Sequence, residues 1–313
     1  MTSNTILVLG GLGFIGKHFI KHFLSAEHTI INIDGYSYAA DRNASKELSN
    51  YSNYVESREY IHNINYLPIC DYIINFAAES HVDNSISDSS PFIHTNISGT
   101  HRILELLRKM DESHRPHYIH ISTDEVYGTS EASYKFCETD VLKPSSPYSA
   151  SKAAADQLVI AYGKTYDLNY TIIRPTNCYG HNQYPEKLIP TICMSLLKNK
   201  QIPVHGDGSY IRTWLHVQDA VEAIAVIMYS KNNNKEIYNI SGPNRLSVLD
   251  VIQLFTKDSN SIKFIANRKG QDLNYNVDDN KLRKLGWRPT RNIEETSSGI
   301  LNKLNPNRFV TRN

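Results

Sequence analysis

The sequence predicts an α/β protein that is built on a doubly wound parallel sheet and carries a smaller C-terminal lobe. The first observation is that short runs of β-branched and aromatic residues alternate with longer helical stretches, as in strand–helix–strand units. The second is a change of composition after Arg174, where prolines and glycines become frequent and the strand–helix alternation stops.

The expected strands are short and apolar, which is typical of strands buried on both faces of a parallel sheet. We predict strands at 5–9, 29–33, 72–76, 118–122 and 170–174, and helices at 14–25, 95–110 and 148–166. A further run at 236–240 has strand character, and we expect it to return to the sheet.

The composition is that of an ordinary globular protein. The chain has 313 residues, of which 40% are hydrophobic and 21% charged, and its net charge is +1. This balance gives no sign of nucleic-acid binding, and no apolar run approaches the roughly 20 residues that span a membrane. The 4 cysteines and 13 histidines show no metal-ligand spacing. We therefore expect reduced thiols, a cytoplasmic location and no metal site.

A glycine-rich turn directly follows the first expected strand. The run GGLGFIG places Gly10, Gly13 and Gly16 between this strand and the next helix. This spacing allows a tight turn, leaves room for a pyrophosphate and points the helix N-terminus at it. Asp34 ends the second strand, where a carboxylate binds the adenosine ribose and repels a 2′-phosphate.

These features predict an NAD-binding Rossmann domain over residues 1–175, to which the strand at 236–240 returns. Residues 176–313 are then expected to form mainly a substrate-binding lobe. In folds of this class, ligands bind beyond the carboxyl ends of the strands, so polar residues at these ends are candidate site residues.

Tyr148 and Lys152 lie four positions apart, and hence on one face of an expected helix. A free tyrosine has a pKa of about 10, and a nearby lysine, helped by a nicotinamide cation, lowers that pKa. Such a pair also arises by chance on helix surfaces. Combined with a dinucleotide fold, however, it resembles the extended branch of the short-chain dehydrogenase/reductase superfamily.

Two adjacent carboxylates, Asp124 and Glu125, follow Thr123 at the end of the strand expected at 118–122. Taken alone, this segment could be a turn of solvated acids. An enzyme that only oxidises an alcohol has no use for two acids. An elimination needs both, because one group removes a proton from carbon and the other protonates the departing oxygen.

Five stretches together resemble the nucleoside-diphosphate-glucose 4,6-dehydratase family. They are GGLGFIG at 10–16, AAESHVD at 77–83, TDEVYG at 123–128, PYSASK at 147–152 and YPEKLIP at 184–190. The resemblance extends to about residue 289. Sugar 4-epimerases share single motifs, but TDE followed by VYG is characteristic of the dehydratases.

The resemblance implies a role for each residue of the catalytic set. Tyr148 would take the proton of the glucose 4-hydroxyl while hydride leaves C4 for NAD, and Lys152 would tune Tyr148 and hold the nicotinamide ribose. Thr123 would hydrogen-bond O4, Glu125 would remove the C5 proton, and Asp124 would protonate the departing C6 hydroxyl. Hydride returned to C6 would then give a 4-keto-6-deoxy sugar and regenerate NAD.

The resemblance also implies binding residues, named here by ligand. The cofactor is expected to contact Gly10, Gly13, Phe14, Ile15, Gly16, Asp34, Tyr38, Asn63, Ile64, Ala77, Ala78, Thr95, Tyr148 and Lys152. The nucleotide-sugar substrate is expected to contact Ser80, Thr123, Asn177, Lys187, His205, Arg212, Asn244 and Arg268. The cationic residues of the second set suit a pyrophosphate.

The chain departs from the family pattern where the nucleotide is handled. Asn63 stands where an aspartate is usual, His205 where a tyrosine is frequent, and Gln271 and Asn274 where a histidine and an arginine are usual. The stretches at 205–209 and 278–287 resemble the dehydratase domain of plant UDP-rhamnose synthases. We therefore favour UDP-glucose over dTDP-glucose as the substrate.

Two other functions remain open at this point. A nucleotide-sugar 4-epimerase would need Tyr148, Lys152 and NAD but no acid pair, so Asp124 and Glu125 argue against it. A non-catalytic dinucleotide-sensing protein would not need the Tyr148–Lys152 pair, which is intact. The family resemblance further implies a homodimer.

Overall fold

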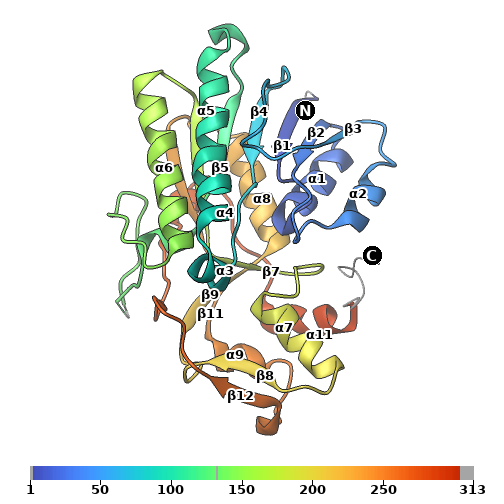
Figure 1. The fold of residues 1–313 in the computed structure, drawn as a ribbon, viewed down its shortest axis with the longest axis vertical. Helices are drawn as coiled ribbons and strands as arrows, with labels where there is room; N and C mark the ends of the chain where they lie inside the picture. The colour runs from blue at the N-terminus through green and yellow to red at the C-terminus, as the bar shows by residue number, and fades with distance from the viewer. Residues whose placement is uncertain (1–2, 132, 304–313) are drawn as a thin grey trace.

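A parallel sheet forms the centre of the computed structural model, which describes residues 3–131 and 133–303. Within these residues the sheet has seven strands in the order β10-β6-β5-β4-β1-β2-β3 (Figure 1). The strands are β1 (Thr5–Leu9), β2 (Thr29–Asp34), β3 (Tyr54–Arg58), β4 (Tyr72–Asn75), β5 (His117–Ile121), β6 (Tyr170–Pro175) and β10 (Glu236–Ile240). Every neighbouring pair in this sheet is parallel.

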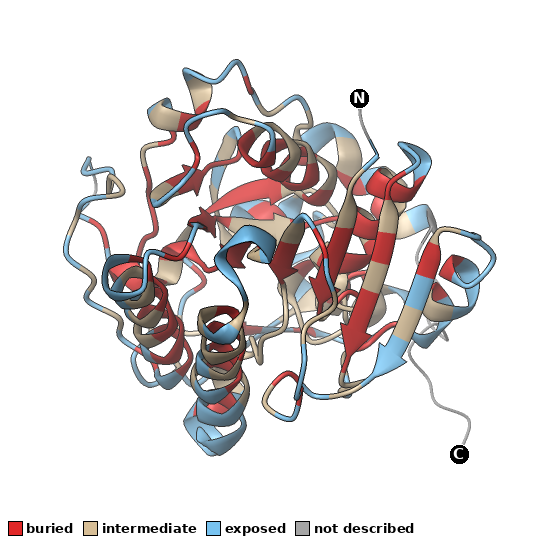
Figure 2. Cartoon of the chain, turned by 90° about the horizontal axis from the view of Figure 1, so that it is seen from above, coloured by how far each residue is buried: buried red, intermediate tan, exposed pale blue. Residues whose placement is uncertain are grey.

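Helices cover both faces of this large sheet because successive strand residues point to opposite sides. Ile6 and Val8 pack with α1 (Phe14–Ser25) and α8 (Val217–Met228). Leu7 and Leu9 pack with α5 (Thr100–Lys109) and α6 (Pro147–Thr165). Figure 2 shows the buried residues gathered on the strands and on the inner sides of the helices, with the exposed residues on their outer sides.

A smaller lobe lies beyond the carboxyl ends of the strands (Figure 1). It has its own apolar core around Ile192, Trp214 and Ile252. Its small sheets have the strand orders β11-β9-β7 and β12-β8. Its elements are β7 (Asn177–Tyr179), α7 (Leu188–Leu197), β8 (Ile202–His205), β9 (Ile211–His216), β11 (Asn244–Ser247), α9 (Val248–Gln253), η4 (Ser259–Ser261), β12 (Ile262–Ile265) and α11 (Ile293–Lys303).

Short elements connect these layers, and several of them follow strands that border the site. They are α2 (Arg42–Leu48), α3 (Val82–Ser87), α4 (Ser90–Phe92), η1 (Ile93–Gly99), η2 (Glu112–His114), η3 (Asp124–Tyr127) and α10 (Asn280–Arg283). The segment expected as one helix at 95–110 is divided, because η1 is a π-helix that passes into α5.

The structure confirms the predicted fold class, a parallel sheet wound with helices on both sides. The segment at 236–240 forms β10 and pairs with β6 in this sheet. The division into domains at residue 175 stays a prediction, and residues 304–313 of the expected lobe lie outside the described residues. Over the described residues, no helix combines the length and the apolar character that crossing a membrane requires.

Candidate active site

A cavity of about 650 Å³ lies between the carboxyl ends of the large sheet's strands and the smaller lobe. Asp34 and Thr123 line it from the sheet side, and Arg212 and Arg268 line it from the lobe. Its volume lies in the range of small-molecule sites, about 300–1,000 Å³. The position is the one in which open α/β sheets bind their ligands.

The glycine run forms a turn against the backbone that follows β4. Gly10 has a φ of +75°, and a Cβ on it would lie 2.6 Å from the Cα of Ala77. A Cβ on Gly16 would lie 2.8 Å from the carbonyl oxygen of Gly10. The first turn of α1, from Phe14, lines the cavity directly after Gly13. Side chains are thus excluded where a pyrophosphate would meet the helix N-terminus, which fits a dinucleotide.

Asp34 is held at the end of β2 by the backbone of two neighbouring turns. Its carboxylate accepts hydrogen bonds from the N–H of Leu12 at 2.9 Å and of Tyr36 at 2.7 Å. Burial raises the pKa of Asp34, and these two donors oppose the change. The carboxylate lines the cavity in the place where the fold holds an adenosine ribose.

Tyr148 and Lys152 lie one turn apart on α6, and both are buried in the cavity wall. The helix begins at Pro147 after Ser146, whose hydroxyl caps the N–H of Ser149. The ammonium of Lys152 donates to the carbonyl oxygen of Ile121 at 2.7 Å, which joins α6 to the end of β5. The capped helix and this bond fix both side chains at the strand ends.

Burial is the main influence on the pKa values of Tyr148 and Lys152. It lowers the pKa of Lys152 to about 8, against the opposing charge of Asp156. Burial and then the charge of Glu125 raise the pKa of Tyr148, and a hydrogen bond with Thr123 opposes them. Additional positive charge beside Tyr148, such as that of an oxidised nicotinamide ring, would therefore be needed to make its phenolate accessible.

The two acids after Thr123 have different surroundings. Glu125 lines the cavity, whereas Asp124 is buried behind it and accepts a hydrogen bond from the Thr123 hydroxyl at 3.3 Å. Burial and the charge of Glu125 raise the pKa of Asp124 to about 8, so its carboxyl group keeps a proton at neutral pH. Burial also raises the pKa of Glu125, while Arg212 and Lys187 oppose it.

A π-helix connects the segment after β4 to α6. Asn96 in η1 accepts from the N–H of Glu79 at 2.9 Å and donates to the carbonyl oxygen of Glu79 at 3.0 Å. The same amide donates to the hydroxyl of Ser151 on α6 at 2.8 Å. Distorted helical turns of this kind are frequent at functional sites, and here η1 joins two segments on the sheet side of the cavity.

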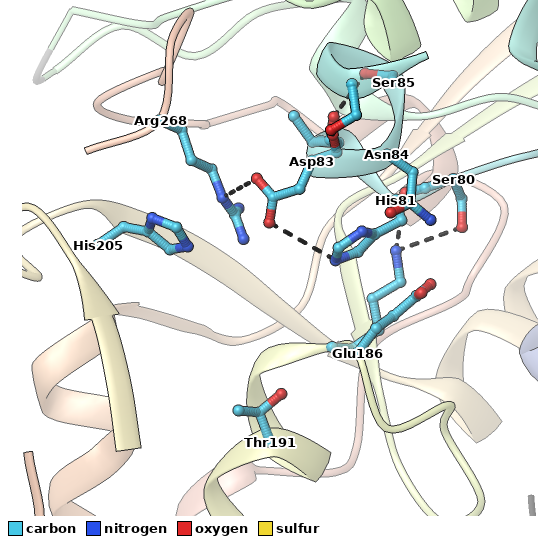
Figure 3. Close-up of polar contacts among 12 residues, drawn as sticks. Ser80, His81, Asp83, Asn84, Ser85, Glu186, Thr191, His205 and Arg268 are labelled. Atoms are coloured by element: carbon cyan, nitrogen blue, oxygen red, sulfur yellow. Dashed lines mark hydrogen bonds and ion pairs between the residues drawn. The ribbon is translucent and has the colours of Figure 1, made fainter. Parts of the chain in front are cut away.

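Positive side chains meet the segment at 80–83 from the smaller lobe. Lys187 donates to the carbonyl oxygen of Ser80 at 2.8 Å, and burial lowers the pKa of Lys187. Figure 3 shows Arg268 reaching Asp83, with 2.6 Å between Nε and Oδ1. His205 lies on the lobe side of the same view, and its Nδ1 is 3.0 Å from the carbonyl oxygen of Ala266. These groups place cationic and aromatic side chains on the lobe side of the cavity.

The cavity brings together most residues that the sequence predicted for the site. Its lining includes Gly10, Gly13, Phe14, Ile15, Gly16, Asp34, Ala77, Ala78, Ser80, Thr95, Thr123, Glu125, Tyr148, Lys152, Asn177, Lys187, His205, Arg212 and Arg268. The binding and catalytic roles assigned to these residues stay predictions.

The lining does not include Tyr38, Asn63, Ile64, Asp124 or Asn244. The Tyr38 hydroxyl donates to Glu186 at 3.0 Å, Asn63 is exposed, and Ile64 is buried in the core. The Asn244 side chain accepts from the N–H of Ile293 at 3.1 Å, at the start of α11. This contact occupies the side-chain oxygen of Asn244.

Sequence reasoning missed several residues of the wall. Glu79 and Glu186 line the cavity and lie inside the motifs at 77–83 and 184–190, so those motifs already contained the signal. Asp272 and Tyr275 also line it. They lie in the segment where the family pattern is broken, and no spacing in the sequence connects them to the acid pair.

The model of the NAD-dependent epimerase/dehydratase family matches residues 6–241, so the chain belongs to this family. Among curated proteins, it is 36% identical to the dTDP-glucose 4,6-dehydratase of Salmonella typhimurium, over 94% of this chain and 90% of that protein. It is 36% identical to the low-salt glycan biosynthesis protein Agl12 of Haloferax volcanii, over 93% and 95% of the respective lengths.

A third relative and a solved structure extend this comparison. The chain is 39% identical to a trifunctional UDP-glucose 4,6-dehydratase, 3,5-epimerase and reductase of Arabidopsis thaliana, covering 93% of this chain but 46% of that protein. The crystal structure of DesIV, the dTDP-glucose 4,6-dehydratase of Streptomyces venezuelae solved with NAD bound, has a TM-score of 0.90 and 34% identity. The alignment covers 95% of this chain and 96% of that one.

These findings confirm the resemblance drawn from the sequence, the expectation of an enzyme of the dehydratase class, and NAD as the cofactor. The choice between UDP and dTDP, the homodimer and the cytoplasmic location stay predictions.

Proposed function

We propose that the protein catalyses the NAD-dependent 4,6-dehydration of a nucleotide-activated glucose to the 4-keto-6-deoxy sugar. The observation that carries this proposal is the acid pair beside Tyr148. Glu125 lies in the cavity wall, and Asp124 lies directly behind it with a raised pKa of about 8. A carboxyl group that is protonated at neutral pH can donate to a departing hydroxyl, and a neighbouring carboxylate can accept a proton from carbon.

The chain's own groups divide the work in this proposal. Tyr148 accepts the proton of the 4-hydroxyl, and Thr123, which shares a hydrogen bond with it, also holds O4. Lys152, fixed on the Ile121 carbonyl, holds the nicotinamide ribose and supplies positive charge. The ketone formed at C4 acidifies the C5 proton, which Glu125 removes while Asp124 protonates the C6 oxygen.

Bound NAD would supply the hydride acceptor for C4 and, in its reduced form, the hydride donor for C6. The residues present fit this cofactor, because the close approach of Gly10 to Ala77 and the fixed carboxylate of Asp34 form a cradle for a pyrophosphate and a ribose. We assign the cofactor to residues 1–175 with the strand at 236–240, and the substrate mainly to the lobe from residue 176.

The favoured substrate is UDP-glucose, with dTDP-glucose second. Lys187, Arg212 and Arg268 line the lobe side of the cavity and suit a diphosphate in either case. The preference for uridine is supported by the stretches that resemble plant UDP-rhamnose synthases and by the 39% identity to the Arabidopsis thaliana relative.

The alternative is a nucleotide-sugar 4-epimerase. A UDP-glucuronic acid 4-epimerase of Bacillus cereus has a TM-score of 0.89 to this structure and is 25% identical. An epimerase uses the Tyr148–Lys152 pair and NAD but leaves the buried Asp124 without a function. A non-catalytic dinucleotide sensor would leave the whole catalytic wall without a function.

The test is to incubate the purified protein separately with UDP-glucose and dTDP-glucose and to identify the products by mass spectrometry. We expect a product lighter by one water, formed without added reductant and faster from UDP-glucose. A product of unchanged mass that is a C4 epimer would support the alternative. Absence of dehydration with both sugars would refute the proposal, and dehydration of dTDP-glucose alone would reverse the preference for uridine.

A further inference from the structure

Tyr275 contacts the acid pair from a distant part of the chain. Its hydroxyl lies 3.4 Å from Oε2 of Glu125, a residue 150 positions away, and 2.6 Å from Oδ2 of Asp272. The Tyr275 side chain is buried and lines the cavity. A phenol has one proton to donate, so the two carboxylates compete for it.

Asp272 is the better acceptor because its carboxylate is firmly held. The Thr129 hydroxyl donates to its Oδ1 at 2.6 Å, and the Ser145 hydroxyl donates to its Oδ2. These donors fix the Asp272 carboxylate and direct Oδ2 at the phenol. The Tyr275 proton therefore goes mainly to Asp272, and Glu125 keeps only the longer contact.

Arg212 fixes the ring of Tyr275 from its face. The guanidinium carbon lies 4.2 Å from the ring centroid, which is a cation–π arrangement, and the same side chain donates to the carbonyl oxygen of Asp272 at 2.9 Å. Ring and hydroxyl are thus held from two directions.

Charged and titratable groups surround Glu125 on all sides. Arg212 from β9 and Lys187 from the segment before α7 are positive. Asp272 is an acidic neighbour, the carboxyl group of Asp124 in the same turn keeps its proton, and the phenol of Tyr148 comes from α6. Glu125 has few side-chain hydrogen bonds of its own in this environment, so the Tyr275 hydroxyl is well placed to select its rotamer.

We infer that Tyr275 is a positioning residue for Glu125. Asp272 holds the Tyr275 hydroxyl at a distance at which it orients the Glu125 carboxylate without strongly lowering its basicity. This inference rests on the proposed function, in which Glu125 removes the C5 proton. The long contact aims one carboxylate oxygen, and the short bond to Asp272 keeps the phenol from donating fully to Glu125. The base thus stays both oriented and strong.

Two substitutions should move the pH dependence of turnover in opposite directions. Tyr275→Phe removes a donor to ionised Glu125, which raises the pKa of Glu125 and shifts the acid limb of kcat to higher pH. Asp272→Asn removes a negative charge and frees the phenol for Glu125, which lowers that pKa and shifts the limb to lower pH. A general loss of structure would not give opposite shifts.

The experiment measures kcat and KM against pH with UDP-glucose or dTDP-glucose, whichever the wild type uses, with and without deuterium at C5. For Tyr275→Phe we expect kcat to fall about tenfold through the loss of orientation, with a larger isotope effect and little change in KM. Tyr179→Phe is the matched control, because this buried tyrosine also makes a hydroxyl contact, to Thr296 at 3.2 Å, and lies outside the cavity lining. Tyr179→Phe should leave kcat, KM and the isotope effect unchanged.

The outcomes separate this inference from the proposed function. A wild-type protein that dehydrates neither sugar would overturn both. With an active wild type, a Tyr275→Phe variant that keeps the wild-type kcat, isotope effect and pH profile would overturn the inference alone. Acid limbs that move in the same direction in Tyr275→Phe and Asp272→Asn would also overturn it.

Discussion

The two walls of the cavity are built in different ways. On the sheet side, each group comes from one short stretch: the glycine run joins β1 to α1, Asp34 ends β2, and the Tyr148–Lys152 pair lies at the start of α6. On the lobe side, Arg212 comes from β9, Arg268 follows β12, and Tyr275 follows a further loop. The first wall is determined by backbone geometry, and the second by contacts between side chains that are distant in sequence.

This difference predicts a division of labour. Backbone geometry tolerates little change, so the sheet wall suits the parts that every turnover needs, the cofactor and the chemistry. Side-chain contacts can be exchanged one at a time, so the lobe wall suits the recognition of one nucleotide sugar among several. Substitutions on the sheet wall should therefore have larger effects than substitutions on the lobe wall.

The largest effect is expected at the acid pair. Glu125→Gln and Asp124→Asn should each lower kcat for dehydration by about 10²–10⁴-fold, the usual contribution of a general acid or base, while NAD stays bound. Because Asp124 must be protonated to donate, wild-type kcat should also fall as the pH rises through about 8, the raised pKa of Asp124. Product mass, and NAD released on denaturation, would be measured. Wild-type rates in both variants would show that these roles are wrong.

A smaller effect is expected at the cofactor turn. Gly10→Ala places a Cβ 2.6 Å from the Cα of Ala77 at a φ of +75°, so it should destabilise the protein by about 1–3 kcal/mol and weaken NAD binding. Gly299→Ala in α11 is the control, because a Cβ there meets nothing within 4 Å and helical alanine is favoured by roughly 0.5–1 kcal/mol. Urea unfolding and NAD titration would measure both. Equal stability and equal NAD affinity of Gly10→Ala and Gly299→Ala would show that the close approach at Gly10 is not needed.

The smallest effect is expected where Arg268 of the lobe wall meets Asp83. Asp83→Asn releases Arg268 from an ion pair whose side chains are 30% and 37% exposed, so stability should change by no more than about 1 kcal/mol. The freed guanidinium should lower KM for the nucleotide sugar about two- to threefold, a modest gain for a partly exposed contact. Glu112→Gln, which breaks the distant pair with Arg115, should leave KM unchanged. A KM that rises in Asp83→Asn would indicate that Asp83 itself binds the substrate.

The same contrast explains which parts of the fold could be predicted from the sequence. The strands at 5–9 and 236–240 and the helix at 14–25 have the predicted bounds, because buried apolar runs with glycine boundaries leave few alternatives. Strand β3 was not predicted, because it pairs only with β2 at the sheet edge and exposes residues such as Val55. The π-helix η1 depends on the contacts of Asn96 with two other segments. The spacing of residues in the sequence does not predict these contacts.

The site follows the same rule. Contiguous motifs indicated the cofactor turn and the catalytic residues, since their geometry is set within a few positions. The meeting of Tyr275 with Glu125 and Asp272 depends on how the smaller lobe folds back over the sheet. Residue types near position 275 carry no information about that approach.

The return of β10 to the large sheet has a consequence for how the chain folds. Strand β6 pairs with β5 on one edge and with β10 on the other, and β10 follows the first part of the smaller lobe in the chain. Until β10 arrives, a fully buried strand presents an open row of backbone donors and acceptors, which is a template for aggregation. Completion of the smaller lobe's early elements and protection of the nascent sheet are therefore coupled, and slow synthesis between residues 175 and 236 would prolong the vulnerable stage.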